Sequence, residues 1–154
     1  LEQVEPPLRA LEPCTAPLSP PAIAAALRDL PSHQALQQRT GATHAAAWCA
    51  FDGRVRLVRE DVGRHNALDK LVGAMVQAGL DPRDGFCCIT SRASVEMVRK
   101  AVAAGITALI AVSAPTARAV ATARRAGLAL AGFARRDDLV LYADPDRFGA
   151  PTLS

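Results

Sequence analysis

The feature that most constrains the fold of this chain is a regular alternation of strand-like and helix-like segments between residues 43 and 143. It begins with two strand-like segments, 43–51 and 54–59, which are joined by Asp52-Gly53, a dipeptide typical of hairpin turns. After the hairpin, apolar residues at helical spacing alternate with short apolar runs typical of buried strands. Because strand–helix alternation favours right-handed crossover connections, the pattern predicts an α/β fold.

The predicted elements follow the order β-β-α-β-α-β-α-β-β and form a three-layer α/β/α sandwich around a mixed sheet. We expect helices over residues 64–77, 94–104 and 116–126, and strands over residues 43–51, 54–59, 86–90, 107–113, 128–134 and 139–143. Gly127 follows the last of these helices, at a position where glycine readily ends a helix. Two shorter helical segments, 21–30 and 32–38, are predicted before the alternation begins.

The composition indicates one domain preceded by an extended segment. Residues 1–20 contain five prolines and are predicted to be an extended lead-in, with a single α/β domain over residues 21–154. Half of the residues are apolar, which is enough for one core. The chain does not begin with Met, and we expect it to be the C-terminal part of a longer protein.

Charge, hydropathy and cysteine usage argue against several classes of protein. The net charge of +3 is small and no basic run occurs, so we expect no nucleic-acid partner. No apolar stretch approaches the ~18 residues of a membrane span, so we expect no membrane partner. The four cysteines have no Cys-x-x-Cys spacing, which indicates a reduced, cytoplasmic setting. We expect them to be buried and unreactive, with Cys14 of the lead-in as the exception.

Polar residues gather where the predicted strands end. Ligands of α/β sheets bind outside the carboxyl ends of the strands, so these residues are candidates for a site. The clusters after four strands are Glu60–Asp69, Ser91–Glu96, Ser113–Thr116 and Phe133–Arg136. Several of them open a helix, where free backbone N–H groups attract anions. The sequence therefore predicts a site for a multiply phosphorylated ligand such as a nucleotide.

The first cluster places Arg64 and His65 at the start of a helix. Arg64 offers a planar pair of donors to an anion, and His65 could orient the ligand or act as a general acid–base. The alternatives are an ordinary helix start with Asp61 near it, and a histidine that is only a hydrogen-bond partner. We expect no catalytic residue within this chain.

The next clusters repeat this arrangement. Ser91 and Arg92 precede one predicted helix, and Ser113 and Thr116 precede another. Hydroxyl groups, an arginine and a helix start together suit a phosphate. The alternative is helix capping, with Ser94 and Thr116 serving the helices that they precede.

In the last cluster, Phe133 could stack on a base, and Arg135 and Arg136 could pair with phosphates; the alternative is a solvated charged turn. His33, His44 and His65 have no Cys or His at ligand spacing, so we expect no metal site and no zinc.

Four blocks of sequence can be compared with known families: Thr40–Trp48 (TGATHAAAW), Glu60–Leu71 (EDVGRHNALDKL), Ser91–Val98 (SRASVEMV) and Ser113–Thr116 (SAPT). Together they resemble the FdhD/NarQ family of formate dehydrogenase accessory proteins. The match runs in order from about Leu1 to Phe148, and the EDVGRHNALDK block is a highly specific signature of the family.

The resemblance implies a cytoplasmic sulfur carrier, homodimeric, with a fold like that of cytidine deaminase. Such a protein receives persulfide sulfur from a cysteine desulfurase. It passes the sulfur to the bis-(molybdopterin guanine dinucleotide) molybdenum cofactor, which then enters formate dehydrogenase. A rival reading is a cofactor chaperone that moves no sulfur. A deaminase-like hydrolase would need zinc, and the Pro-Cys-x-x-Cys pattern of those enzymes is absent.

The resemblance also implies residues that hold the guanine dinucleotide, for which guanosine diphosphate would be a mimic. They are Phe133, Ala134, Arg135, Arg136, Asp137 and Asp138. Asp138 stands where the family has a basic residue, and Arg136 could substitute for it. The family's nucleophile lies in a Cys-x-x-Cys loop that this sequence lacks and that Cys14 does not match, so we expect the chain to be inactive in sulfur transfer on its own.

Overall fold

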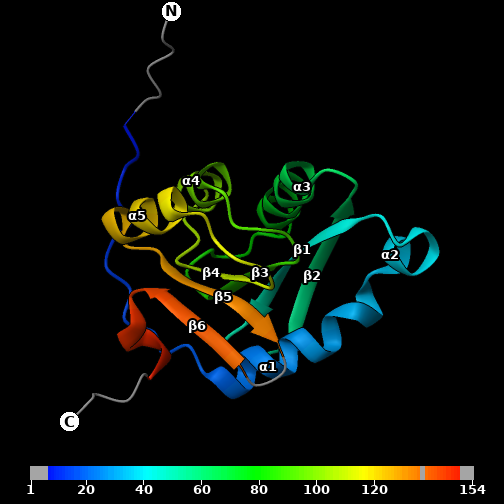
Figure 1. Cartoon of the computed structure of the whole chain (residues 1–154), viewed down its shortest axis with the longest axis horizontal. Helices are drawn as coiled ribbons and strands as arrows, with labels where there is room; N and C mark the ends of the chain where they lie inside the picture. The colour runs from blue at the N-terminus through cyan, green and yellow to red at the C-terminus, as the bar shows by residue number, and fades with distance from the viewer. Residues whose placement is uncertain (1–6, 136–137, 150–154) are drawn as a thin grey trace, which may run out of the picture.

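The computed structural model of the chain, which describes residues 7–135 and 138–149, contains a six-stranded mixed sheet with the spatial order β2-β1-β3-β4-β5-β6 (Figure 1). The strands are β1 (His44–Ala50), β2 (Val55–Asp61), β3 (Gly85–Ile89), β4 (Ala108–Ala111), β5 (Ala129–Arg135) and β6 (Asp138–Ala143). β1 is antiparallel to β2 and to β3, β3 to β5 are mutually parallel, and β6 returns antiparallel to β5. The α/β class and the mixed sheet are confirmed.

Helices cover both faces of the sheet (Figure 1). The helices α3 (Arg64–Gln77), α4 (Val95–Ala103) and α5 (Ala117–Ala126) lie side by side on one face, and α1 (Pro20–Asp29) lies on the other. The three helices predicted after the hairpin are confirmed, and α3 has the bounds that its apolar spacing predicted. α5 ends at Gly127, which has a left-handed φ of 77°, as expected for a terminating glycine.

The strand residues alternate between two cores. In β4, Leu109 and Ala111 face the core beneath α3, α4 and α5, whereas Ala108 and Ile110 face the core beneath α1. All four are buried, as the continuous apolar run predicted for a strand covered on both faces. Successive strand residues point to opposite faces, so one short segment contributes to both cores.

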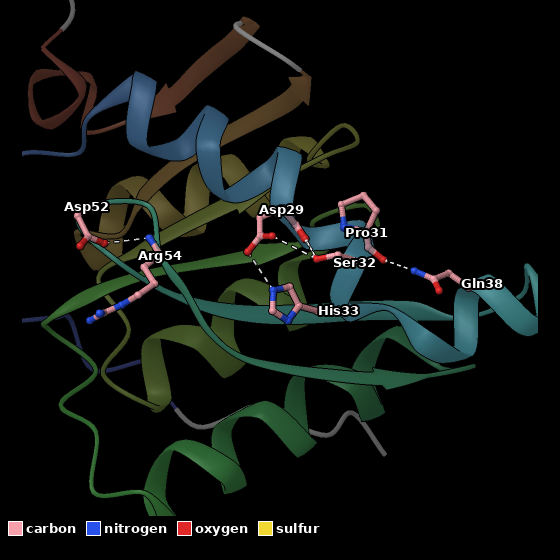
Figure 2. Close-up of polar contacts among 7 residues, drawn as sticks. All are labelled: Asp29, Pro31, Ser32, His33, Gln38, Asp52 and Arg54. Atoms are coloured by element: carbon pink, nitrogen blue, oxygen red, sulfur yellow. Dashed lines mark hydrogen bonds and ion pairs between the residues drawn. The ribbon is translucent and has the colours of Figure 1, made fainter.

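The chain between α1 and β1 differs from its prediction. A second helical piece is present, but it is not continuous over the expected residues 32–38: a 3-10 turn, η1 (Leu30–His33), is followed by the short helix α2 (Ala35–Thr40). Pro31 has no N–H and cannot continue the hydrogen bonds of α1. Figure 2 shows the contacts that hold this connection: the Ser32 hydroxyl and the His33 ring bond to Asp29, and the Gln38 amide donates to the Pro31 carbonyl at 2.8 Å.

Residues 7–19 form no helix or strand and cross one end of the sheet from the α5 side to the α1 side (Figure 1). The Leu11 N–H donates to the Ala126 carbonyl at 2.9 Å, and the Leu18 N–H donates to the Arg147 carbonyl at 2.6 Å. Arg147 belongs to η2 (Pro145–Phe148), a 3-10 turn after β6. Within residues 7–135 and 138–149, no helix is long and apolar enough to cross a membrane.

Candidate functional site

The carboxyl ends of four strands meet at one end of the sheet. β2 and β3 are both antiparallel to β1, so they run in the same direction, and β4 and β5 are parallel to β3. The helices α3, α4 and α5 follow β2, β3 and β4 along the chain and therefore begin at this end. The sheet thus brings together the strand ends at which the sequence analysis expected a ligand.

A hollow of about 280 Å³ lies at this end of the sheet. We call it the anion cradle. Its lining residues are His44, Arg64, Ser91, Arg92, Ser94 and Thr116. Its volume is just below the range of about 300–1,000 Å³ of drug-sized ligand sites, which suits one phosphate-bearing portion of a larger ligand. Four predicted residues, Arg64, Ser91, Arg92 and Thr116, are therefore brought together.

The starts of three helices make the anion cradle electropositive, because backbone N–H groups at a helix start carry partial positive charge. The Ser94 hydroxyl caps α4 by accepting from the Met97 N–H at 3.3 Å, and the Thr116 hydroxyl caps α5 by accepting from the Ala119 N–H at 3.1 Å. The capping alternative is confirmed for both residues. α3 follows Gly63, which offers no side-chain cap.

The acidic residues around Arg64 have structural partners. The Glu60 carboxylate accepts hydrogen bonds from the N–H groups of Leu36 and Gln37 at 2.9 and 3.0 Å, which satisfies the start of α2. Asp69 pairs with Lys100 of α4 at 2.7 Å. These acids position the helices. Some polar residues of Glu60–Lys70 therefore stabilise the fold, while others belong to the candidate site.

Asp61 organises the turn between β2 and α3. Its carboxylate accepts from the Gly63 N–H at 2.9 Å and pairs with the Lys70 ammonium at 2.6 Å. The hydrogen bond from Lys70, followed by that from the Gly63 N–H, lowers the pKa of Asp61 to about 2. The turn that presents Arg64 is thus held by an ionised carboxylate.

The Asp61→Asn variant is expected to lose part of the acid sensitivity of the protein. Because the folded-state pKa of Asp61 is about 2 and its ordinary value is 3.8, its contribution is complete above the ordinary value and is lost as the pH falls toward 2. Urea unfolding at a series of pH values should therefore show that the free energy of unfolding of the variant falls less steeply in acid than that of the wild type. Asp84→Asn, at an exposed acid elsewhere, is the control. An equal decrease in the free energy of unfolding at acidic pH for the wild type and Asp61→Asn would contradict this role.

Two predicted residues lie beside the anion cradle and are not part of its lining. His65 is near Glu96, whose pKa is lowered mainly by its own backbone N–H; the Ser94 hydroxyl and the charges of His65 and Arg118 add to this, and together these effects outweigh burial, which raises the pKa. His65 is thus placed beside an acid. Ser113 accepts a hydrogen bond from the Phe133 N–H at 3.2 Å through its carbonyl and so links the end of β4 to β5.

The described residues of the segment 133–138, which are Phe133, Ala134, Arg135 and Asp138, do not line the anion cradle. Ala134 and Arg135 line a second hollow of about 390 Å³, which we call the α1-side hollow because Leu27, Leu30 and other residues of α1 and η1 form its wall. Phe133 has a left-handed φ of 50° and is 41% exposed. Asp138 lies opposite Arg135 in the backbone pairing of β5 with β6. Arg136 and Asp137 lie outside the described residues.

The unusual backbone of Phe133 accompanies an irregularity in the sheet. The pairing of β5 with β6 shifts register between Gly132 and Arg135, so the ladder is interrupted at Phe133. A bulky residue with positive φ is strained, and such strain is found most often at binding sites. Phe133 therefore presents an exposed ring at the end of the sheet that also holds the anion cradle.

Comparison with known proteins assigns the chain to a family. The family model described as the FdhD/NarQ family matches residues 1–149. The chain belongs to the FdhD/NarQ family. It is 58% identical over 130 residues to the sulfur carrier protein FdhD of Variovorax paradoxus, and 54% identical over 132 residues to that of Bordetella petrii. These alignments cover 84% and 86% of this chain but 47% and 48% of the relatives, so the chain spans about half their length.

A solved structure supports the same assignment. A protein from Desulfotalea psychrophila, described as a candidate formate dehydrogenase accessory protein, superposes with a TM-score of 0.82 at 26% sequence identity. The superposition covers 90% of this chain and 60% of the other chain. The resemblance that the four sequence blocks indicated is therefore confirmed, whereas the likeness to cytidine deaminase stays a prediction.

Sequence reasoning missed His44 as a site residue in this FdhD/NarQ member. His44 begins β1, and it lines the anion cradle with Arg64 and Arg92. His44 is close to these arginines because β1 lies between β2 and β3 and is antiparallel to both. The amino end of β1 therefore lies beside the carboxyl ends of β2 and β3. The hairpin at Asp52-Gly53 was the available signal, because it predicted that β1 and β2 run in opposite directions.

Another part of this FdhD/NarQ member has a hollow of larger volume that none of the predicted site residues lines. A hollow of about 660 Å³ lies between residues 7–12 of the lead-in and α4. Within the described ranges, no group of three or more His, Cys, Asp or Glu residues is placed to hold a metal ion. The anion cradle, which gathers cationic and hydroxyl side chains at three helix starts, remains the better candidate site.

Proposed function

We propose that this chain is the cofactor-binding part of a sulfur-carrier accessory protein that serves formate dehydrogenase. The observation that carries the proposal is the anion cradle, in which Arg64, Arg92 and three helix starts surround one hollow. The names of the relatives support the sulfur-carrier role, and that of the solved structure supports the link to formate dehydrogenase.

The ligand that we propose is the bis-(molybdopterin guanine dinucleotide) molybdenum cofactor, which the protein carries as cargo. The donors of the anion cradle fit its phosphates, since arginine side chains and helix starts are the usual phosphate-binding groups of proteins. In the α1-side hollow, Arg135 adds a further cation beside the apolar Leu27 and Leu30. The exposed ring of Phe133 is available to stack on a guanine base.

In the intact protein, a cysteine desulfurase is the proposed sulfur donor, and formate dehydrogenase receives the sulfurated cofactor. The electropositive end of the sheet would help to hold a nearby thiol as its thiolate. We further propose a homodimer that works in the cytoplasm. The residues of this chain are assigned to binding and orienting the cofactor: Arg64 and Arg92 hold phosphates, and His65 orients the ligand.

The alternative is a cofactor chaperone that transfers no sulfur. It is favoured by three of the four cysteines of this chain, because Cys49, Cys87 and Cys88 are buried in the sheet. Burial raises the pKa of Cys87, which keeps its thiol protonated and unreactive. Detecting a persulfide on the intact protein after treatment with a cysteine desulfurase would distinguish the carrier from the chaperone.

The proposal predicts that guanosine diphosphate binds this chain and that Arg92→Ala weakens the binding. Loss of the charged hydrogen bonds of one arginine is worth about 1.5–3 kcal/mol, or roughly 10- to 150-fold in Kd. Isothermal titration calorimetry with guanosine diphosphate measures the effect, and guanosine, which has no phosphate, should bind more weakly.

The matched control is Arg56→Ala. Arg56 is an exposed arginine near the start of β2, at the opposite end of that strand from the anion cradle. Its replacement by alanine changes the net charge of the protein by the same amount as Arg92→Ala. Its variant should bind guanosine diphosphate like the wild type. Undetectable binding by the wild-type chain at millimolar nucleotide, or equal weakening by both substitutions, would overturn the site assignment.

A further inference from the structure

Cys14 lies in a segment that two arginines hold in place. It is partly exposed, whereas the other three cysteines of the chain are buried. The Arg83 guanidinium donates to the carbonyls of Glu12 and Pro13 at 3.2 and 2.8 Å. The Arg147 guanidinium donates through Nε to the carbonyl of Ala16 at 2.9 Å. The backbone on both sides of Cys14 is therefore anchored to the domain.

Two buried donors beside the segment that contains Cys14 have no hydrogen-bond partner; one belongs to Arg147, which bonds to Ala16, and the other to Thr107, which bonds to Arg147. Arg147 is 5% exposed and also donates through Nη1 to the Thr107 carbonyl at 2.9 Å, but its Nη2 has no partner. Thr107 is 0% exposed, and its Oγ1 also has no partner. Among the buried side-chain nitrogen and oxygen atoms of the described residues, these two atoms are the unsatisfied ones.

Unsatisfied buried donors are rare in proteins, because each retains a desolvation cost that a hydrogen bond would offset. Here both atoms can donate, and the guanidinium carries a full positive charge. An acceptor that reaches both atoms would satisfy them, and a negative charge on that acceptor would also pair with the guanidinium. The Cys14 thiol is the reactive group of the segment that Arg147 holds, and Thr107 and Arg147 both act on it, so an anion carried on that sulfur has suitable chemistry.

The same groups act on the Cys14 thiol itself. Partial burial would raise its pKa, but the Ala16 N–H, the Thr107 hydroxyl and the charges of Arg147 and Arg83 together outweigh burial and lower the pKa. Thr107 thus influences the thiol without making a hydrogen bond of ordinary geometry to it. A lower pKa increases the fraction of nucleophilic thiolate.

We propose that Cys14 is a sulfane-sulfur acceptor, and that the Thr107 hydroxyl and Nη2 of Arg147 bind the terminal sulfur of the persulfide formed on it. The Cys14 thiolate attacks the outer sulfur of a donor persulfide. A new S–S bond forms at Cys14 while the donor's S–S bond breaks, and the donor leaves as a thiol carrying the proton of its former persulfide. No external oxidant or reductant is needed.

The added sulfur explains the two unsatisfied donors. One S–S bond extends the reactive atom by about 2 Å beyond the original sulfur and moves the negative charge outward. The inference rests on the proposed sulfur-carrier function and adds a receiving residue to it. Thr107 precedes β4, at the opposite end of the sheet from the anion cradle. Cys14 is therefore assigned to receiving sulfur, and not to its delivery to a ligand in the anion cradle of the same chain.

The test uses glutathione persulfide as the donor and intact-protein and peptide mass spectrometry as the readout. The native chain should gain one sulfur at Cys14, faster than the same chain in denaturant. The buried Cys49, Cys87 and Cys88 should stay unmodified and serve as internal controls. Cys14→Ser should gain no sulfur in the native state.

Thr107→Val separates the binding role from a structural one. Removing one hydrogen bond to the charged sulfur is expected to slow persulfide formation about tenfold. The melting temperature should not fall, since the variant replaces an unsatisfied buried hydroxyl with a methyl group of similar size. Thr122→Val, at a buried threonine on α5, is the matched control and should leave the rate unchanged.

Three results would overturn the inference. They are no sulfur on native Cys14, a mixed disulfide with glutathione in place of the persulfide, and an unchanged rate for Thr107→Val. The nucleotide titration is a separate measurement on the same protein. A chain that binds guanosine diphosphate but takes no sulfur overturns this inference alone, whereas a chain that takes sulfur but binds no nucleotide overturns the assignment of the anion cradle alone.

Discussion

Replacing Gly85 with alanine is expected to destabilise the protein by about 3 kcal/mol or more, a large part of the roughly 5–15 kcal/mol that stabilises a domain. Gly85 begins β3 beside β1, and a Cβ atom at this position would collide with the backbone carbonyl of Cys49 and touch the ring of Trp48. The carbonyl belongs to a strand in the middle of the sheet and cannot move without disturbing its pairing. Chemical denaturation monitored by circular dichroism would measure the loss.

Gly73→Ala is the matched control for this substitution. Gly73 lies within α3, and a Cβ atom there meets nothing within 4 Å. Alanine has the higher helix propensity, so the variant should gain about 0.5–1 kcal/mol. If Gly85→Ala unfolds at the same denaturant concentration as the wild type, the close approach of β1 and β3 at this point is wrong.

Reversing the charge of Arg64 is expected to reduce the affinity for guanosine diphosphate by more than about 100-fold. Arg64→Glu removes the charged hydrogen bonds of one arginine, worth about 1.5–3 kcal/mol, and adds a carboxylate that repels the phosphates. The new carboxylate also competes for the N–H groups at the start of α3. The effect should exceed that of Arg92→Ala, and calorimetry on both variants measures the difference.

The fold of Arg64→Glu should be preserved. Arg64 is exposed at the first position of α3, where an acidic side chain interacts favourably with the helix dipole. The melting temperature should therefore equal or exceed that of the wild type. Arg56→Glu makes the same change in charge away from the anion cradle and should bind nucleotide within a few-fold of the wild type. Similar losses for both variants would show that net charge, and not the anion cradle, governs binding.

Periodicity predicted most of the elements because each is short and locally determined. The apolar spacing of residues 64–77 gave the bounds of α3, and Asp52-Gly53 marked the hairpin between β1 and β2. Prediction failed around Pro31, where a 3-10 turn separates α1 from α2. The outcome there depends on contacts such as the bonds of Leu36 and Gln37 to Glu60, which lies far along the chain.

The candidate site was predicted in part. Arg64, Ser91, Arg92 and Thr116 follow strands that run in the same direction, so their meeting followed from the α/β pattern. The α1-side location of Arg135 did not follow from it, because the register shift at Phe133 changes the course of β5 beyond Gly132. The partners of Glu60 and Asp61 were likewise not predictable, since an acid beside an arginine suits a site and a helix start equally well.

The sequence by itself determined the family, the alternation of strands and helices and the strand ends that carry anion-binding residues, because these depend on local spacing and on a specific signature. Only the tertiary structure decided which polar groups remain available. It placed His44 in the anion cradle, gave Glu60 and Asp61 structural partners, and left donors of Thr107 and Arg147 unsatisfied near the segment that contains Cys14. The physical reason is that hydrogen bonding is a matter of three-dimensional proximity: a donor is available for a ligand only when no other part of the folded chain has taken it.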